Sequence, residues 1–292
     1  MPLQFKPLHA LFAAEASGID LRKSLSQEQI REIDDGMNKY AVLVFRNQPL
    51  DQDQQIDFAK SLGPLDLGLR KLKRNPHRFK HEELIDISNV NPDGQVAPRD
   101  HAKIVGNIAN QLWHSDSSFQ RPRARYSMLQ AITLTSWGGE TEFADLRAAY
   151  DGLPDRLRRD AEGRSAEHYA LHSRAMLGDD QYSDAQKNAI PPVEWPLVDT
   201  HVGSGRKLLF VGIHCRRVSG MTLPEGRMLI MDLLEHATQP KFVYRHVWRV
   251  GDLVIWDNRA TLHRGRRFDV TERRELRRTT TEDVDSTAQI AV

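Results

Sequence analysis

The feature that most constrains the fold is a succession of short strand-like runs in the second half of the chain. Each run is rich in apolar and β-branched residues, and turns that contain Gly138-Gly139 or Gly251-Asp252 separate them. The runs that we expect to be strands are residues 126–134, 141–143, 207–212, 242–250, 253–256 and 274–280. Many short strands with turns between them are typical of a β-sandwich or a jelly-roll barrel. We therefore predict a mainly β fold with helices packed outside it.

Helical spacing of apolar residues marks further segments that would flank the sheet. Ser26 and Gln29 have the spacing of a capping box, and the apolar residues after them recur every three or four positions. Asp51 or Asp53 can cap a second helix, which ends at Gly63. The predicted helices are residues 26–39, the segment from 51 or 53 to 62, and residues 148–161 and 226–236.

Residues 69–107 depart from both patterns. Lysine and arginine crowd the first part, proline and glycine recur in the second part, and only residues 84–88 resemble a strand. A loop this long inside a compact domain is usually functional or disordered. No repeat or linker divides the chain, so we expect residues 1–292 to form a single domain. Within it we expect an active-site loop or lid at 69–107 and a frayed polar tail at 282–292.

The charge and cysteine content exclude several classes of protein. Among 292 residues, 41 lysines and arginines stand against 40 aspartates and glutamates, and a net charge of +1 gives no overall field to attract nucleic acid or an anionic membrane. No apolar run approaches the roughly 20 residues of a membrane-spanning helix. Cys215 is the only cysteine, which excludes an intrachain disulfide and favours a reducing compartment. We expect a cytoplasmic protein with no nucleic-acid or membrane partner.

Two histidines and one aspartate form the first candidate site. His114 and Asp116 are two residues apart, so on a strand both side chains point to one face. His263 follows the predicted strand 253–256 after a short bend, and a sheet that closes on itself can bring it beside the first pair. Two histidines and one carboxylate on one side of a metal suit non-haem Fe(II) and oxygen chemistry. The simpler alternative for a lone His-x-Asp is a hydrogen-bonded polar pair.

Three further residues favour the metal site. Thr141 follows a Gly-Gly turn, Arg274 lies 11 residues after His263, and Arg278 lies four residues beyond Arg274, on the same face of a strand. A 2-oxo acid that chelates iron needs a cation for its remote carboxylate, and arginine can bind a carboxylate through two hydrogen bonds. The charges also balance, because Fe(II), Asp116 and one arginine sum to two positive charges and 2-oxoglutarate carries two negative charges.

The residues around these positions form four motifs. They are WHSDSSF at 113–119, GGETEF at 138–143, WDNR at 256–259 with His263-Arg264, and RRELRR at 273–278. Together they resemble the TauD/TfdA family of Fe(II)/2-oxoglutarate-dependent dioxygenases, over residues 8 to 280. Within that family the chain is most similar to the 2,4-dichlorophenoxyacetate dioxygenase branch, through NIANQLW at 107–113, AEHYAL at 166–171 and LEHATQ at 234–239.

The resemblance implies a double-stranded β-helix core of the cupin-like, jelly-roll type. It implies that His114, Asp116 and His263 are catalytic ligands of Fe(2+), and that Thr141 and Arg274 contact 2-oxoglutarate with Arg278 close by. The implied reaction consumes O2 and hydroxylates the carbon next to the ether oxygen of an aryloxyacetate such as 2,4-dichlorophenoxyacetate. Its products are a phenol, glyoxylate, succinate and CO2, and ascorbate is the expected reductant in vitro.

The residues that hold the acidic substrate are less specified. Candidates are cationic or polar side chains near the motifs: Lys71, His201, His214 and Arg217. In the phenoxyacetate branch a second histidine is expected shortly after the position of His214, whereas this chain has Arg216-Arg217. That departure puts the identity of the substrate in question.

Several alternatives stay open. Within the family, the substrate is instead taurine, another alkylsulfonate, a sulfate ester or another small organic acid. In a different class, the site holds zinc and hydrolyses an ester or amide, although a hydrolase has no need of Arg274 at its spacing. In a third class, the chain is a cupin-like binding module without turnover. Assembly as a homo-oligomer is compatible with all of these.

Overall fold

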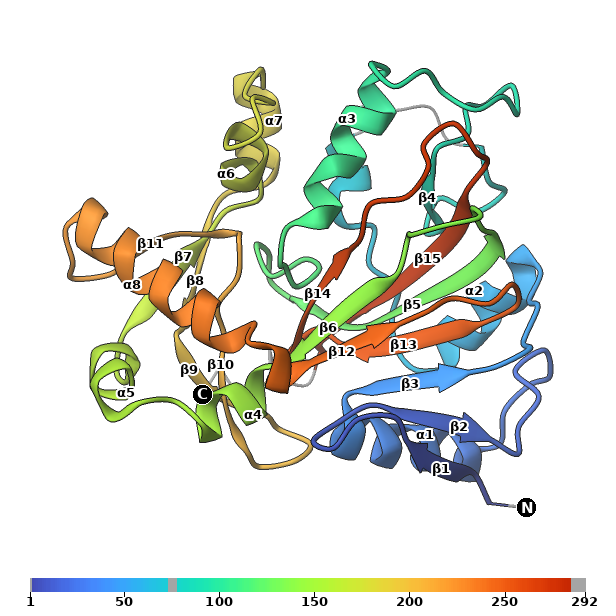
Figure 1. Ribbon diagram of the computed structural model, residues 1–292, viewed down its shortest axis with the longest axis horizontal. Helices are drawn as coiled ribbons and strands as arrows, with labels where there is room; N and C mark the ends of the chain where they lie inside the picture. The colour runs from blue at the N-terminus through green and yellow to red at the C-terminus, as the bar shows by residue number, and fades with distance from the viewer. Residues whose placement is uncertain (1, 73–77, 285–292) are drawn as a thin grey trace.

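The computed structural model describes residues 2–72 and 78–284, and its largest element is a seven-stranded sheet (Figure 1). Neighbouring strands are antiparallel except for the parallel pair β2 and β3. From one edge to the other, the strands are β1 (Gln4–Pro7), β2 (Ala14–Ser17), β3 (Val42–Phe45), β13 (Leu253–Asp257), β5 (Ala124–Thr133), β15 (Glu275–Glu282) and β4 (Ile85–Ser88).

A second sheet of three antiparallel strands faces the first. It consists of β12 (Val243–His246), β6 (Thr141–Asp145) and β14 (Thr261–Gly265). Strand β13 is buried on both faces, because Val254 and Trp256 share a cluster with Phe143 of the second sheet while Leu253 and Ile255 point to the other side. The predicted mainly β fold with flanking helices is therefore confirmed.

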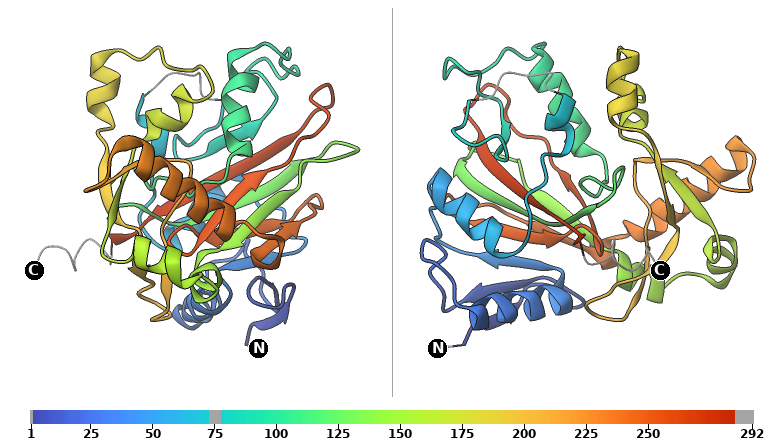
Figure 2. Two further views of the ribbon diagram at one scale, coloured as in Figure 1. Left: turned by 60° about the vertical axis from the view of Figure 1, so that its left-hand side comes forward. Right: turned by 180° about the vertical axis from the view of Figure 1, so that it is seen from behind.

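Helices α1 (Gln27–Tyr40) and α2 (Gln52–Ser61) cover the outer face of the large sheet (Figure 2). Each begins with a capping box: the Ser26 hydroxyl accepts from the Gln29 backbone N–H, and the Asp51 carboxylate accepts from that of Gln54. Ile33 of α1 is fully buried in the cluster beneath these helices. Both helices start where the capping residues predicted.

A smaller layer lies beside the two sheets. Its strands are β7 (Ser165–His168), β8 (Val193–Pro196), β9 (Val198–Thr200), β10 (Lys207–Leu209) and β11 (Cys215–Val218). Its helices are α4 (Leu146–Asp151), α5 (Asp155–Ala161), α6 (Ala170–Ala175), α7 (Asp184–Ala189) and α8 (Leu223–Ala237). The predicted helix at 148–161 is divided into α4 and α5, because Pro154 cannot continue a helix from the preceding turn.

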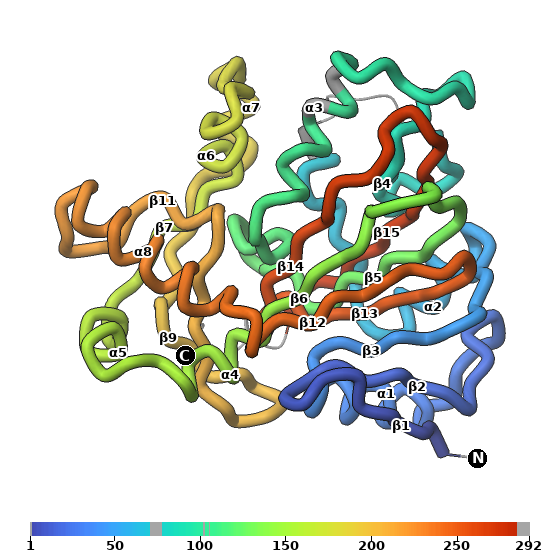
Figure 3. The backbone as a smooth tube through the Cα atoms, viewed as in Figure 1, coloured from blue at the N-terminus to red at the C-terminus, as the bar shows by residue number. Residues whose placement is uncertain are grey.

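The segment expected to be mostly loop contains more structure than its composition indicates. Besides β4 it holds the 3-10 turn η1 (Gly68–Leu72) and helix α3 (Ala102–Ile108), which runs into η2 (Ala109–Gln111). Figure 3 shows α3 at the same end of the molecule as α6 and α7. Helix α3 has seven residues and includes a glycine, so its sequence carries little helical signal of its own.

The C-terminal end of the described chain also differs from expectation. The frayed tail was predicted from residue 282, but Glu282 still belongs to β15 and Asp283 is fully buried. Arg123 and Arg259 form ion pairs with Asp283 at 3.2 Å each, and these pairs hold the backbone in place. Residues 285–292 of the predicted tail lie outside the described part. No helix within residues 2–72 and 78–284 is long and apolar enough to cross a membrane.

Candidate active site

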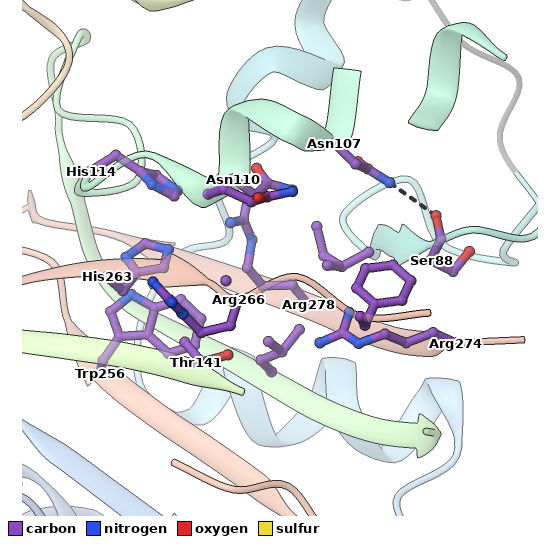
Figure 4. A pocket seen from close by; sticks show the side chains of 15 residues that line it. Ser88, Asn107, Asn110, His114, Thr141, Trp256, His263, Arg266, Arg274 and Arg278 are labelled. Atoms are coloured by element: carbon purple, nitrogen blue, oxygen red, sulfur yellow. Dashed lines mark hydrogen bonds between the residues drawn. The ribbon is translucent and has the colours of Figure 1, made fainter. Parts of the chain in front are cut away.

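A short antiparallel backbone pairing brings His114 beside His263. The His114 N–H donates to the carbonyl of His263 over 3.1 Å, and the His263 N–H donates to the carbonyl of His114 over 2.8 Å. The two ring centres are 4.1 Å apart, and Figure 4 shows both imidazoles at one end of a cavity. Strand β14, which carries His263, is not among the strands that the sequence predicts, because its polar residues lack the apolar pattern of the other strands.

Asp116 completes a group of three side chains that could hold a metal ion. Its carboxylate oxygens lie 4.0 Å from Nε2 of His114 and 3.7 Å from Nε2 of His263. One ligand atom from each of the three residues lies within 4.8 Å of the others, and all three residues are buried. Two imidazole nitrogens and one carboxylate on one side of a metal are the donor set that suits non-haem Fe(II), so these residues fit that ion.

Burial prepares both imidazoles for metal binding. It lowers the pKa of His114 and the pKa of His263 below the usual 6.5, so each ring is neutral at pH 7. Nδ1 of His114 lies 2.7 Å from the Leu112 carbonyl, which only accepts, so Nδ1 is the donor and the Nε2 lone pair faces Asp116. His114 therefore presents the unprotonated nitrogen that a metal requires, and His263 is a neutral ring whose Nε2 also faces Asp116.

Neighbouring side chains hold Asp116 in its ionised form and in one orientation. Burial alone would raise the pKa of Asp116, but the charge of Arg278 outweighs it, and the pKa lies well below its ordinary value. Arg278 Nη1 donates to Oδ1 over 2.5 Å, and the Ser127 hydroxyl donates to Oδ2 over 2.7 Å. The Asn258 side chain accepts from the Asp116 backbone N–H at 3.0 Å. Ser127 and Asn258 were not identified from the sequence.

A cavity of about 70 Å³ extends from the two histidines to Arg274 (Figure 4). The Arg274 guanidinium is buried, and within the described residues it forms no ion pair. It donates to the Gly139 carbonyl over 2.8 Å, while its Nε has no hydrogen-bond partner in the described part of the chain. Burial lowers the pKa of Arg274 to about 10, so it remains a cation at pH 7. A buried, unpaired cation is costly, and an anionic ligand in this cavity would relieve the cost.

Thr141 and Arg278 line the same cavity as Arg274. The Trp248 indole N–H donates to the Thr141 hydroxyl oxygen over 3.0 Å, which leaves the Thr141 hydroxyl hydrogen free to donate. Apolar side chains of Ile87, Leu129 and Phe268 form much of the remaining wall. The structure thus brings together every residue that the sequence analysis assigned to the metal and the 2-oxo acid.

A second, larger cavity of about 590 Å³ shares His114 and Arg278 with the first and is also lined by Asp116. Phe119 and Ile213 contribute apolar surface to it. His214 also lines it, and its ring lies edge-to-face with that of His114, with ring centres 6.1 Å apart. This cavity has the size of a small-molecule site and reaches the candidate metal ligands.

The other substrate candidates from the sequence lie elsewhere. His201 is buried against Asp257, with its Nε2 3.0 Å from the carboxylate, and lines neither cavity. Arg217 is exposed, pairs with Glu167 at 3.0 Å and also lines neither cavity. Lys71 belongs to η1, but its side chain lies outside the described part of the structure. Of the four candidates, the described side chains bring only His214 to the larger cavity.

Comparison with known proteins gives close relatives over nearly the full chain. The family model described as taurine catabolism dioxygenase TauD, TfdA family, matches residues 4–280. An alpha-ketoglutarate-dependent 2,4-dichlorophenoxyacetate dioxygenase of Cupriavidus pinatubonensis (strain JMP 134) is 61% identical over 97% of this chain and 99% of its own length. A protein of the same description from Burkholderia sp. (strain RASC) is 59% identical over 96% of this chain and 95% of its own.

A solved structure is also similar. The crystal structure of AAD-2 in complex with Mn(II) and N-oxalylglycine superposes with a TM-score of 0.89 and 42% sequence identity, covering 97% of this chain and 98% of that one. Such agreement covers nearly the whole of both chains. It supports a jelly-roll core of the type that the sequence motifs predicted.

Proposed function

The chain belongs to the taurine catabolism dioxygenase TauD, TfdA family, and on that premise we propose that it is an Fe(II)/2-oxoglutarate-dependent dioxygenase that hydroxylates an aryloxyacetate such as 2,4-dichlorophenoxyacetate. The observation that carries the proposal is a single cavity with His114 and His263 at one end and an unpaired, buried Arg274 at the other. A metal and a dianion would each complete one end of it.

The residues for the metal are His114, Asp116 and His263. The iron, when bound, supplies the redox chemistry that couples conversion of 2-oxoglutarate and O2 into succinate and CO2 with hydroxylation of the substrate. The chain contributes two neutral imidazoles and one carboxylate, and Arg278 and Ser127 keep that carboxylate ionised and oriented. Hydrogen bonds to a side chain that binds a metal orient that side chain and tune its affinity for the metal.

Arg274 and Thr141 would bind the remote carboxylate of 2-oxoglutarate. The Arg274 Nη2 is held by the Gly139 carbonyl, so the guanidinium is already fixed before a ligand arrives. The Thr141 hydroxyl, with its oxygen engaged by Trp248, can donate one more hydrogen bond. The apolar wall around them excludes water and strengthens the ion pair between Arg274 and the carboxylate.

The larger cavity would hold the aryloxyacetate. Its contact with His114 and Asp116 allows the carbon between the ether oxygen and the carboxylate to lie beside the metal site. Hydroxylation of that carbon gives a hemiacetal, which breaks down to a phenol and glyoxylate. The 61% and 59% identities to two 2,4-dichlorophenoxyacetate dioxygenases support this substrate class over sulfonates and sulfate esters.

The test is a panel of acids with protein loaded with Fe(II) without oxygen, then supplied with 2-oxoglutarate, ascorbate and O2. We expect phenol and succinate to form in equal amounts from 2,4-dichlorophenoxyacetate, and little succinate with taurine. Preference for taurine or an alkyl sulfate would overturn the substrate class. Hydrolysis of an ester or amide without O2 would overturn the reaction class and favour a zinc hydrolase. Binding without turnover of any acid would favour a binding module.

A further inference from the structure

An acidic substrate in the larger cavity needs a cation that is not already neutralised. Arginine and lysine side chains from several elements line this cavity: Arg70, Arg78, Lys103, Arg174 and Arg278. A guanidinium or ammonium group that already pairs with a carboxylate has less to offer a second one. The existing partners of these five side chains therefore indicate which of them is available.

Three of the five are engaged by carboxylates of the protein. Arg78 pairs with Asp86 at 2.7 Å and with Glu275 at 2.8 Å. The ammonium group of Lys103 binds Asp86 at 2.6 Å. Arg278 is held by the candidate metal ligand Asp116.

The remaining two cations are Arg70 and Arg174. Arg70 already has an interaction partner of its own. Arg174 forms no ion pair within the described residues. Arg174 is therefore the lining cation whose charge no described carboxylate neutralises.

Arg174 is also fixed in position. It lies on α6, and its Nη1 donates to the Gly106 carbonyl of α3 over 2.8 Å. This bond uses one of the five N–H groups of the guanidinium, and no other hydrogen bond of the Arg174 side chain joins it to a described residue. The unused N–H groups can bind both oxygens of a carboxylate, and the bond to Gly106 reduces the entropy lost when they do.

The position of Arg174 matches the chemistry of an aryloxyacetate. The carbon to be hydroxylated is bonded directly to the carboxylate, so the anchoring cation must lie at the metal end of the cavity. The neighbouring residue Ser173 contacts Nδ1 of His214 at 3.1 Å, and the His214 ring lies edge-to-face with His114. Arg174 lines the larger cavity together with His214 and His114. Phe119 lines it too and lies against His214, with ring centres 5.1 Å apart.

We propose that Arg174 binds the carboxylate of the aryloxyacetate, with the aromatic ring against Phe119 and Ile213. This inference rests on the proposed function and names the residue that selects an acid at that site. It replaces Arg217, the arginine that the sequence suggested, because Arg217 pairs with Glu167 and lines neither cavity. The hydrogen bond from Arg174 to Gly106 links α6 to α3, which lie at the same end of the molecule (Figure 1).

The experiment compares Arg174→Gln and Arg174→Lys with the wild type on two substrates. One substrate is 2,4-dichlorophenoxyacetate and the other is its uncharged analogue 2,4-dichlorophenoxyacetamide. Glutamine keeps a donor for the Gly106 carbonyl and loses the charge, whereas lysine keeps the charge and loses the fork. Arg156→Gln is the matched control, because Arg156 lies on α5 with its side chain 70% exposed and pairs with Asp160 and Asp232.

For Arg174→Gln we expect the KM for the acid to rise by roughly 10- to 100-fold, as for loss of a charge-assisted hydrogen bond. The KM for 2-oxoglutarate and the kinetics with the amide should stay within about twofold, so the preference for acid over amide collapses. Arg174→Lys should recover part of the affinity for the acid. The control variant should match the wild type on every measure.

Two results would overturn the inference while the proposed function stands. In one, the wild type is active and Arg174→Gln keeps the acid KM within twofold, which would direct the search to Lys71. In the other, the variant loses acid and amide activity equally and its melting temperature falls, which is the signature of a structural bond to Gly106 alone. A wild type that forms no succinate with any aryloxyacetate would overturn the proposed function and this inference with it.

Discussion

The candidate metal site and a buried ion cluster around Asp257 contain the same residue types, histidine, aspartate and arginine, but pair them differently. In the cluster, the Asp257 carboxylate binds His201 at 3.0 Å and receives two hydrogen bonds from the Arg259 guanidinium at 2.9 and 2.7 Å. Arg259 continues to Asp283, so each charge meets an opposite charge. In the metal site, the histidine Nε2 atoms lie 3.7 to 4.0 Å from the carboxylate and form no hydrogen bond with it.

The difference separates groups that stabilise the fold from groups that await a ligand. A buried charge is tolerated when its polar atoms are paired, and a buried polar atom without a partner requires an explanation. Arg259 and Arg274 illustrate both cases. Arg259 has two carboxylate partners, whereas the Arg274 guanidinium hydrogen-bonds, among the described residues, to a backbone carbonyl and lies over the Phe268 ring. Removing a member of the closed cluster should therefore cost stability, and removing a member of the open site should cost activity.

The largest effect is expected from the metal ligands. His263→Ala removes one of three ligands, and two remaining ligands seldom hold Fe(II), so turnover should fall by about 1000-fold or more. Succinate formation and iron content after desalting are the measurements, and circular dichroism should report an intact fold. His81→Ala is the control, because His81 is a half-buried histidine that pairs with Asp53 and lines neither cavity. Retention of iron with more than a tenth of the activity would contradict the assignment.

The closed cluster should respond in the opposite way. Asp257→Asn leaves Arg259 without its bidentate partner, and the free energy of unfolding should fall by about 3–5 kcal/mol. The kcat/KM of the folded fraction should change by only a few-fold, because Asp257 lines neither cavity. Urea unfolding measures the change in stability, and initial rates measure the change in kcat/KM. A variant that is as stable as the wild type would show that the cluster contributes nothing net.

The stability lost in Asp257→Asn should also depend on pH. Burial opposes ionisation of Asp257, but Arg259 and His201 outweigh it and hold the pKa well below its ordinary value. A lowered pKa means that the unfolded chain takes up the proton first as the pH falls, so the stabilisation is complete above the unfolded pKa of about 3.9 and is lost below it. The stability difference between wild type and Asp257→Asn should be constant above about pH 5 and shrink in more acidic solution.

Arg274→Gln should weaken binding of 2-oxoglutarate without weakening the fold. The KM for 2-oxoglutarate should rise by roughly 10- to 100-fold, since one charge-assisted carboxylate contact is lost. The ligand-free variant should be at least as stable as the wild type, because a buried guanidinium without an ion pair is itself costly. A melting curve with and without 2-oxoglutarate measures both effects. Loss of stability without a change in KM would place Arg274 with the structural arginines.

The smallest effect is expected from Ser127→Ala. Its hydroxyl donates to Asp116 at 2.7 Å and accepts from the Asn258 amide at 3.0 Å, so its loss leaves Asp116 less well oriented. Removing such a partner of a metal ligand should lower the affinity for Fe(II) by about 10-fold. Activity titrated against Fe(II) at saturating 2-oxoglutarate measures the change. An unaltered titration would show that Arg278 alone positions the carboxylate.

Local patterns were sufficient for about half of the strands, β5, β13 and β15 among them, and for the chemistry of the site. The capping residues Ser26 and Asp51 marked two helices correctly, because a cap acts within one turn of the chain. The motifs around His114 and Arg274 identified the ligands because their chemistry depends on the residue type and on short spacing. Strand β14 and helix α3 were missed, since their few residues become regular only through contacts with β6 and the cavity wall.

The sequence alone determined which atoms are available: two imidazoles, a carboxylate and two arginines in motifs of a known family. Only the tertiary structure decided which of the remaining polar groups are already paired. His201 and Arg217 had the right chemistry for a substrate, yet carboxylates of the protein engage both, whereas Arg174 carried no local signal and keeps its charge free at the cavity. The physical reason is that pairing of charges depends on distance through space, and neighbours along the chain do not reveal it.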